Sequence, residues 1–124
     1  MPSEQNSQRR ALVVDDDDTV VEHVTQVLHK MGFAVDCAVD GLDALVRCQS
    51  SRFDVIICDI RMPRLSGISF LSNLGKTLNA TTRVIVISGL DDNAIRNQVL
   101  SSGASAYLVK PIAAQDLRDA IGKL

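Results

Sequence analysis

Short apolar runs and longer segments of helical spacing alternate five times along the chain. The helical segments carry apolar residues at intervals of three and four, as Val20, Val24 and Val27 do ahead of Gly32. The short runs are rich in Val and Ile, and most are unbroken by polar residues, which indicates strands covered on both faces. Such alternation builds right-handed βα repeats and predicts an α/β fold with a parallel sheet between two layers of helices. The runs span residues 11–14, 34–39, 55–58, 84–87 and 106–109.

The later helical segments have residues suited to helix ends. Asp40 introduces the second helix, whose apolar positions include Leu42 and Val46. Ser66 introduces the third helix, and Gly75 lies near its end. Apolar residues at helical spacing normally face a core, so we expect those of the second helix to do the same.

Length and composition are typical of one compact domain. The chain has 124 residues, of which 46% are hydrophobic, and no linker or repeat divides it. We expect residues 1–10 to form a disordered polar tail and residues 11–124 to form the domain. The formal charge of −2 gives no electrostatic footprint for nucleic acid, and no apolar run is long enough to span a membrane. We therefore expect no direct nucleic-acid or membrane partner.

The cysteines favour a reducing compartment. Cys37, Cys48 and Cys58 form no CxxC pair and are odd in number. Each lies in an apolar or amphipathic stretch, so we interpret all three as small core residues without a metal or redox role. No secretory leader is expected, and the predicted location is the cytoplasm.

Side chains suited to phosphate chemistry follow four of the predicted strands. The first strand is followed by four Asp residues (15–18) and the third by Asp59. Ser88 follows the fourth strand and Lys110 the fifth. Ligands of open parallel sheets bind beyond the carboxyl ends of the strands, where the strand order reverses. If the first and third strands are neighbours, the carboxylates converge on one crevice.

Converging carboxylates repel each other and raise each other's pKa values, and a divalent cation relieves this conflict. Mg²⁺ prefers oxygen ligands and needs only one or two carboxylates because it keeps several waters. The Lys110 ammonium adds a positive charge and the Ser88 hydroxyl adds a hydrogen-bond donor. These groups are suited to hold a phosphoryl group beside a carboxylate nucleophile, so the pattern predicts an aspartyl phosphate formed with Mg²⁺.

Several of these residues have simpler interpretations as helix caps. The segment Thr19-x-x-Glu22 matches a capping box, and Asp17 and Asp18 also suit a helix N-terminus. We favour a capping role for both of these Asp residues. Each of the other residues, taken alone, is also explained as a cap or a surface charge, and their combination at four strand ends is what favours phosphate chemistry.

In these motifs the sequence resembles the CheY-like receiver domains of two-component signalling, from Arg10 to Leu124. The resemblance implies a flavodoxin-like (βα)5 three-layer sandwich with strand order 2-1-3-4-5. The matching segments have the family's order and spacing. They are LVVDD (12–16), DVIICDIRMPRLSG (54–67), VIVISG (84–89) and GASAYLVKP (103–111).

The resemblance implies a role for each acidic residue of the crevice. Asp59 would be the phosphoacceptor and, together with Asp16, a carboxylate ligand of Mg²⁺. Asp15 would contribute to the metal site directly or through water, and the backbone carbonyl of Arg61 would supply a further ligand.

The resemblance also implies how a phosphoryl group is held and sensed. Ser88 and Lys110 would bind its oxygens. Tyr107 would be the switch aromatic, whose inward or outward rotamer follows Ser88 as that residue moves toward the phosphate.

The loops around the crevice also match the family. Pro63 and Gly67 would shape the loop after the phosphoacceptor, and the peptide bond that precedes Pro111 is expected to be cis. Arg61 and Leu90 would flank the access route to the phosphoryl group and influence the rates of phosphorylation and hydrolysis.

The expected partners are proteins of a phosphorelay. His23 and His29 are predicted to be surface residues of the first helix, and the length leaves no room for an ATP site. The donor would therefore be the phosphohistidine of a histidine kinase or histidine phosphotransfer protein, or a small phosphodonor. The domain would have no enzymatic activity other than its own phosphorylation and dephosphorylation. The fourth helix, fifth strand and fifth helix (91–102, 106–109 and 114–124) would form the output face for an unknown effector or a homodimer.

Two other interpretations remain open at this point. The pattern Asp15-x-Asp17-x-Thr19 after an apolar strand also matches the first motif of haloacid-dehalogenase-like phosphatases. There the first Asp is the nucleophile and the second a general acid, but this alternative leaves Asp59 and Tyr107 without a role. The other is a receiver-like binding module that is never phosphorylated, although such modules usually lack one of the required groups.

Overall fold

The computed structural model describes residues 8–61 and 64–123 and contains one parallel sheet of five strands. Their order is β2-β1-β3-β4-β5, with every neighbouring pair parallel, so the predicted flavodoxin-like topology is confirmed. The strands are β1 (Arg10–Val14), β2 (Ala34–Ala38), β3 (Val55–Asp59), β4 (Arg83–Ser88) and β5 (Ala106–Val109).

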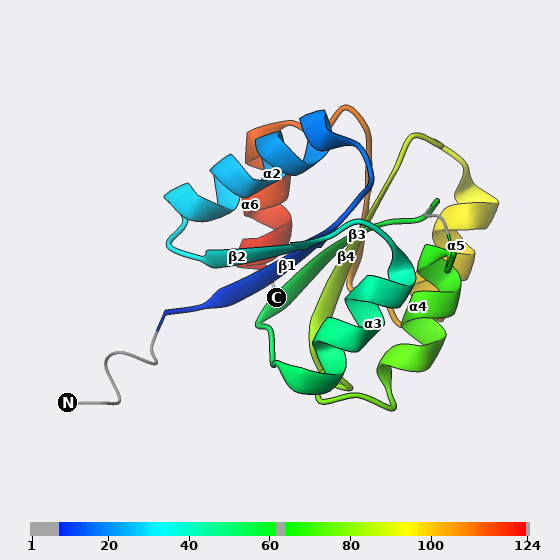
Figure 1. Cartoon of the computed structure of the whole chain (residues 1–124). Coiled ribbons are helices and arrows are strands. Elements are labelled where there is room, and N and C mark those ends of the chain that lie inside the picture. Colours follow the sequence, from blue (N-terminus) through cyan, green and yellow to red (C-terminus); the bar gives the residue numbers. More distant parts are fainter. Residues whose placement is uncertain (1–7, 62–63, 124) are drawn as a thin grey trace.

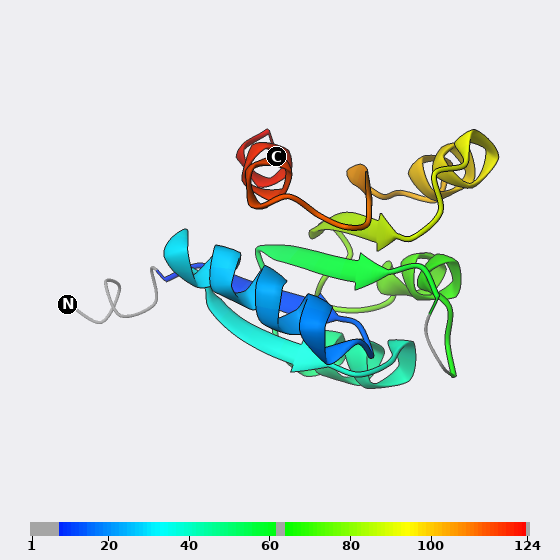
Figure 2. The ribbon, with the colours of Figure 1, turned by 90° about the horizontal axis from the view of Figure 1, so that it is seen from above.

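Among the residues that the structure describes, five helices cover the two faces of the sheet. Figures 1 and 2 show α2 and α6 on one face and α3, α4 and α5 on the other. None of the helices in the described part of the chain has the length and hydropathy of a membrane span. The helices are α2 (Asp18–Lys30), α3 (Gly41–Ser50), α4 (Gly67–Leu74), α5 (Asn93–Ser101) and α6 (Ala114–Gly122).

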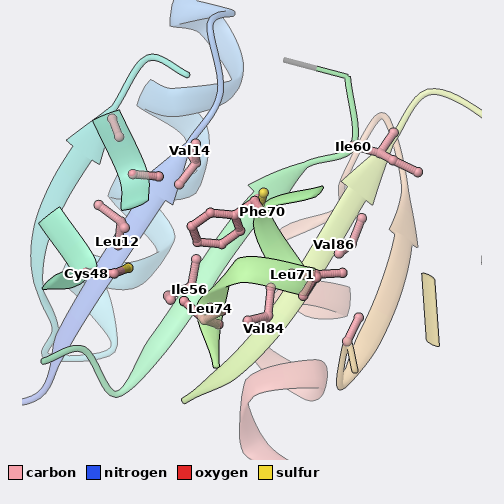
Figure 3. Close-up of a cluster of buried hydrophobic side chains, with 14 of the residues drawn as sticks. Leu12, Val14, Cys48, Ile56, Ile60, Phe70, Leu71, Leu74, Val84 and Val86 are labelled. Atoms are coloured by element: carbon pink, nitrogen blue, oxygen red, sulfur yellow. The ribbon is translucent and has the colours of Figure 1, made fainter. Parts of the chain in front are cut away.

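Each face of the sheet buries its own apolar layer, as the unbroken strand runs predict. Along β1, Leu12 and Val14 face the layer beneath α3, α4 and α5, whereas Val13 faces the layer beneath α2 and α6. Figure 3 shows the first of these layers, in which the fully buried Phe70 of α4 lies among strand residues. Because side chains alternate along a strand, one run supplies both layers. This packing fixes the strand ends that carry the polar residues.

The packing of the second helix and of β2 differs from the sequence-based expectation. On α3, Gly41, Ala44 and Cys48 face the core, whereas Leu42 and Val46 are 41% and 62% exposed. The small side chains allow α3 to approach its neighbours closely, which turns the larger apolar residues outward. Cys48 and Cys58 are buried as predicted, but Cys37 is exposed. It lies on β2, an edge strand that is only partly covered.

The boundaries at both termini can be compared only in part. β1 begins at Arg10, which pairs with Ala34, so the last residue of the predicted tail belongs to the sheet. The rest of the predicted tail up to residue 7, and Leu124 at the other terminus, lie outside the described residues.

Candidate functional site

The carboxylates after β1 and β3 meet at one edge of the sheet because these strands are neighbours. Val14 pairs with Cys58 in the parallel register, so the residues that follow them, Asp15 and Asp59, lie side by side. One carboxylate oxygen from each of Asp15, Asp16 and Asp59 lies within 4.8 Å of the others. Asp15 and Asp59 are buried, and Asp16 is exposed. The predicted convergence of these carboxylates is confirmed.

Lys110 reaches into this cluster from the end of β5. Its Nζ lies 3.0 Å from Asp15 Oδ2 and 3.3 Å from Asp59 Oδ2. Its backbone N–H donates to the carbonyl of Ser88, which ties the ends of β4 and β5 together. The peptide bond between Lys110 and Pro111 is cis, as the resemblance implies. A cavity of about 260 Å³ opens beside the cluster, lined by Asp59, Ile60, Arg61, Ser88, Gly89, Leu90 and Lys110.

The site carries more negative than positive charge, with three carboxylates around the ammonium of Lys110. Burial, together with the nearby charge of Asp15, raises the pKa of Asp59 in spite of the opposing effect of Lys110. Burial lowers the pKa of Lys110, but close contacts with the Asp15 and Asp59 carboxylates and their negative charges outweigh burial and leave that pKa raised. Lys110 therefore stays protonated at neutral pH.

The donor set fits a divalent cation. Asp15 Oδ1 accepts the backbone N–H of Asp17 at 2.9 Å, whereas the buried Asp15 Oδ2 accepts no hydrogen bond within the described chain. The Lys110 ammonium lies at ion-pair distance from this oxygen, without hydrogen-bond geometry. An acceptor of this kind, beside two further carboxylates, is the hard oxygen environment that Mg²⁺ or Ca²⁺ prefers.

Excess negative charge in the site makes a prediction about stability. Asp59→Asn should raise the free energy of unfolding at neutral pH by on the order of 1 kcal/mol, the scale of one close like-charge contact. Folding raises the pKa of Asp59, so wild-type stability falls as pH rises from the unfolded-state to the folded-state pKa and stays lower above it. Urea unfolding without divalent cations at low and neutral pH measures this difference.

Asp119→Asn on α6 is the control for this experiment, because its carboxylate is exposed and does not belong to the cluster. It should change stability by less than about 0.5 kcal/mol. Mg²⁺ should stabilise the wild type more than Asp59→Asn, because binding to the folded state alone adds stability. A less stable Asp59→Asn at neutral pH would contradict the charge balance described here.

A chain of hydrogen bonds leads from Ser88, which lines the cavity, toward Tyr107. The Leu90 N–H donates to Ser88 Oγ at 3.0 Å, and the Tyr107 hydroxyl donates to the Leu90 carbonyl at 2.6 Å. Ser88 is fully buried and Tyr107 is 5% exposed, so the aromatic ring occupies an inward position. The Arg96 guanidinium on α5 lies over this ring, 5.1 Å from its centroid. No periodicity in the sequence had indicated Arg96.

Asp17 caps a helix, as predicted, but the capping box is wrong. Asp17 is the N-cap of α2, and its Oδ1 accepts the N–H of Thr19 at 3.0 Å. Asp18 and Thr19 are already helical, so the predicted capping role of Asp18 is wrong, and the cap precedes the predicted Thr19 cap by two residues. Asp17 and Asp18 are both exposed.

The loop after Asp59 closes back on β3 at Gly67. A Cβ atom at this position would lie 2.8 Å from the Asp59 carbonyl oxygen and 2.9 Å from the Ile60 Cα, so only glycine fits. The Gly67 N–H donates to the Ile60 carbonyl at 2.9 Å. The predicted shaping role of Gly67 therefore has a steric basis, whereas that of Pro63 lies outside the described residues.

Comparison with known proteins decides the family. The family model of the response regulator receiver domain matches residues 11–122. This chain belongs to that family. The receiver domain is similar to the transcriptional regulatory protein PrrA of Mycobacterium leprae, with 38% identity over 111 residues, which are 90% of this chain and 47% of PrrA. The chain spans about half the length of the first curated relatives it matches.

Solved structures of response regulators share the fold. A response regulator from Burkholderia pseudomallei, with a phosphorylated aspartic acid, a calcium ion and citrate, matches with a TM-score of 0.82 and 27% identity. The match covers 91% of this chain and 66% of the other. The CheX–CheY–BeF3–Mg²⁺ complex from Borrelia burgdorferi matches with a TM-score of 0.86 and 30% identity, covering 93% and 87% of the two chains.

Proposed function

We propose that this receiver domain accepts a phosphoryl group on Asp59 from the phosphohistidine of a histidine kinase or histidine phosphotransfer protein, in a Mg²⁺-dependent reaction. The observation that carries the proposal is the position of Lys110, whose ammonium bridges Asp15 and Asp59 beside a cavity that also contains Ser88. Solved relatives with a phosphorylated aspartic acid, or with BeF3 and Mg²⁺, support the same chemistry.

Each residue of the site has its own role in this transfer. The Asp59 carboxylate forms the new O–P bond as the N–P bond of the donor phosphohistidine breaks, in line with the attacking oxygen. The Lys110 ammonium and the Ser88 hydroxyl donate hydrogen bonds to phosphoryl oxygens. Asp15, Asp16 and Asp59 would hold Mg²⁺, which offsets phosphoryl charge when bound.

Arg61 completes this arrangement in the proposal. Its N–H donates to Asp59 Oδ1 at 3.4 Å, and it lies on the rim of the cavity. Its backbone carbonyl would be a further metal ligand. The exposed Arg61 side chain and Leu90, which also lines the cavity, would influence how readily donor and water reach Asp59.

The direct test is Mg²⁺-dependent labelling by acetyl phosphate. The label should map to Asp59 and be released by hydroxylamine, as an acyl phosphate is. The competing phosphatase interpretation instead requires turnover of phosphate esters that depends on Asp15. Here the Asp17 carboxylate accepts the Thr19 N–H as a helix cap, which supports a receiver without further enzymatic activity.

We further propose that phosphorylation acts on the face formed by α5, β5 and α6. Ser88 would move toward the phosphoryl group, and the Leu90 backbone that it contacts would carry the movement to Tyr107. The Tyr107 ring is already buried in this structure, so phosphorylation would increase the fraction of molecules in which it is buried. The face would then bind a downstream effector or a second copy of the domain. Direct contact with nucleic acid or membrane has no role in this proposal.

Tyr107 gives this switch a direct signal, because the chain has one Tyr and no Trp. Adding beryllofluoride with Mg²⁺ should lower the acrylamide quenching of tyrosine fluorescence by about two-fold, if the fraction of molecules with a buried Tyr107 ring rises from about one half to nearly all. Mg²⁺ alone and fluoride alone are the controls. Unchanged quenching in a protein that demonstrably binds beryllofluoride would contradict the proposed route through Ser88 and Leu90.

The proposed location is the cytoplasm. All three cysteines are free, and Cys37 is exposed, which suits a compartment that keeps thiols reduced. Burial raises the pKa of Cys48 to about 11, so this thiol is protonated and unreactive at neutral pH.

A further inference from the structure

Arg64, in the loop between β3 and α4, is tied to the start of α3 by an ion pair whose carboxylate is buried, whereas the Arg64 side chain is 59% exposed. Asp40 is the N-cap of α3 and is 6% exposed. Its Oδ1 accepts the Asp43 N–H at 2.8 Å, and its Oδ2 lies 2.8 Å from Arg64 Nε and 2.7 Å from Arg64 Nη2. Both carboxylate oxygens are therefore occupied, one by the helix and the other by the loop.

The Asp40 carboxylate is charged when it makes this contact. The hydrogen bond from the Asp43 N–H lowers the pKa of Asp40 against the effect of burial, and Arg64 lowers it further. A charged hydrogen bond to a guanidinium is stronger and more directional than one between neutral groups. The contact is thus well suited to hold one loop conformation.

The backbone of Arg64 has a conformation that needs such support. Its φ is 67°, and it is the one described residue other than glycine with positive φ. Side chains with a Cβ atom rarely adopt this region, because the Cβ approaches the following carbonyl. The guanidinium contact with Asp40 helps to hold Arg64 there.

Steric contact fixes the same junction. A Cβ atom at position 41 would lie 2.4 Å from the Leu65 carbonyl oxygen and 2.7 Å from Leu65 Cβ, so the loop rests directly on Gly41. α3 and α4 lie side by side on one face of the sheet (Figure 1). With Gly67 packed against Asp59 and Ile60, the described residues 64–67 of the loop that follows Arg61 are anchored on both β3 and α3.

We propose that Asp40 and Arg64 are positioning residues for the metal site, because they hold the loop that presents the Arg61 carbonyl next to Asp59. This inference rests on the proposed function, in which that carbonyl ligates Mg²⁺. It assigns Asp40 a second task besides capping α3. Loss of the pair should weaken metal binding, even though neither side chain belongs to the carboxylate cluster.

The experiment measures Mg²⁺ affinity by calorimetric titration of the full chain. Arg64→Gln and Asp40→Asn should each raise the dissociation constant about ten-fold, the lower end of the effect of losing a group that orients metal ligands. Asn still accepts the Asp43 N–H, so Asp40→Asn keeps the helix cap, while an uncharged NH2 group that cannot accept from Arg64 replaces the second oxygen. The double variant should resemble each single variant, because both remove one interaction.

Arg47→Gln is the matched control, since Arg47 makes its ion pair within α3, with Asp43, rather than with the loop. It should leave the Mg²⁺ dissociation constant unchanged. Arg64→Gly tests the role of the guanidinium separately, because glycine suits positive φ and is the variant expected to fold most readily. Arg64→Gly should bind Mg²⁺ as weakly as Arg64→Gln.

The outcomes separate this inference from the proposed function. Weaker binding by the Asp40 and Arg64 variants, with Arg47→Gln unchanged, supports the positioning role. Wild-type affinity in Arg64→Gln, Arg64→Gly and Asp40→Asn would overturn that role alone, even if urea unfolding shows lower stability. A wild type that does not bind Mg²⁺ would overturn the proposed function and this inference with it.

Discussion

Asp59→Asn is expected to reduce Mg²⁺-dependent labelling by acetyl phosphate at least about 1000-fold, because a carboxamide is a far poorer nucleophile than a carboxylate. Lys110 Nζ lies 3.0 Å from Asp15 Oδ2, so Lys110 should keep a charged partner in this variant. Intact-protein mass spectrometry after a fixed reaction time measures the labelled fraction, and peptide mapping identifies the residue.

The stability prediction makes this experiment unambiguous. Asp59→Asn should be at least as stable as the wild type even without divalent cations, so it stays folded during labelling and missing label cannot be attributed to unfolding. Asp17→Asn is the matched control, because Asp17 is exposed and caps α2 through an oxygen that Asn also offers. It should keep nearly wild-type labelling. Label that persists in Asp59→Asn, or that maps to Asp15, would refute Asp59 as the acceptor.

Asn79→Ala should destabilise the domain by about 3 kcal/mol, because it leaves several buried polar groups without partners. Asn79 is fully buried, and its Oδ1 accepts the Phe53 N–H at 2.8 Å. Its Nδ2 donates to the carbonyls of Cys48 and Ser51 at 2.9 and 2.7 Å. The Asn79 side chain thus joins the C-terminal end of α3 to the segment that leads into β3. Urea unfolding followed by circular dichroism measures the loss.

Asn73→Ala is the comparison for Asn79→Ala. Asn73 donates to the carbonyl of Ser69 within its own helix, so its removal leaves no buried donor or acceptor unpaired. This variant should lose less than about 1 kcal/mol. Asn79 lies at the edge of the sheet opposite Asp59, so folded Asn79→Ala should still be labelled by acetyl phosphate. Equal stability of the two variants would show that the Asn79 network contributes little.

The local pattern of the sequence was sufficient for the elements of the fold. Alternation of apolar runs and helical segments predicted every strand and helix of the described chain, because the two periods differ and each is visible within a few residues. It also placed Asp59, Ser88 and Lys110 at strand ends. The residues alone left the strand order open, and the resemblance to receiver domains supplied it.

Contacts between distant segments were visible only in the structure. The pattern of α3 indicated that Leu42 and Val46 belong to its packed side, but the close approach of Gly41 to Leu65 turns them outward. The pairing of Asp40 with Arg64 and the position of Asn79 have no periodic signal, since each depends on how separate segments pack. Such contacts are set by shape complementarity rather than by spacing along the chain.

The sequence alone determined the α/β alternation, the residues at the strand ends and the suitability of these residues for Mg²⁺ and phosphate. Only the tertiary structure decided that Lys110 and Asp59, 51 positions apart, meet at 3.3 Å, and that Asp15 Oδ2 is buried without a hydrogen bond. The physical reason is that periodicity reports which face of an element is apolar, whereas strand order and helix packing determine which ends become neighbours.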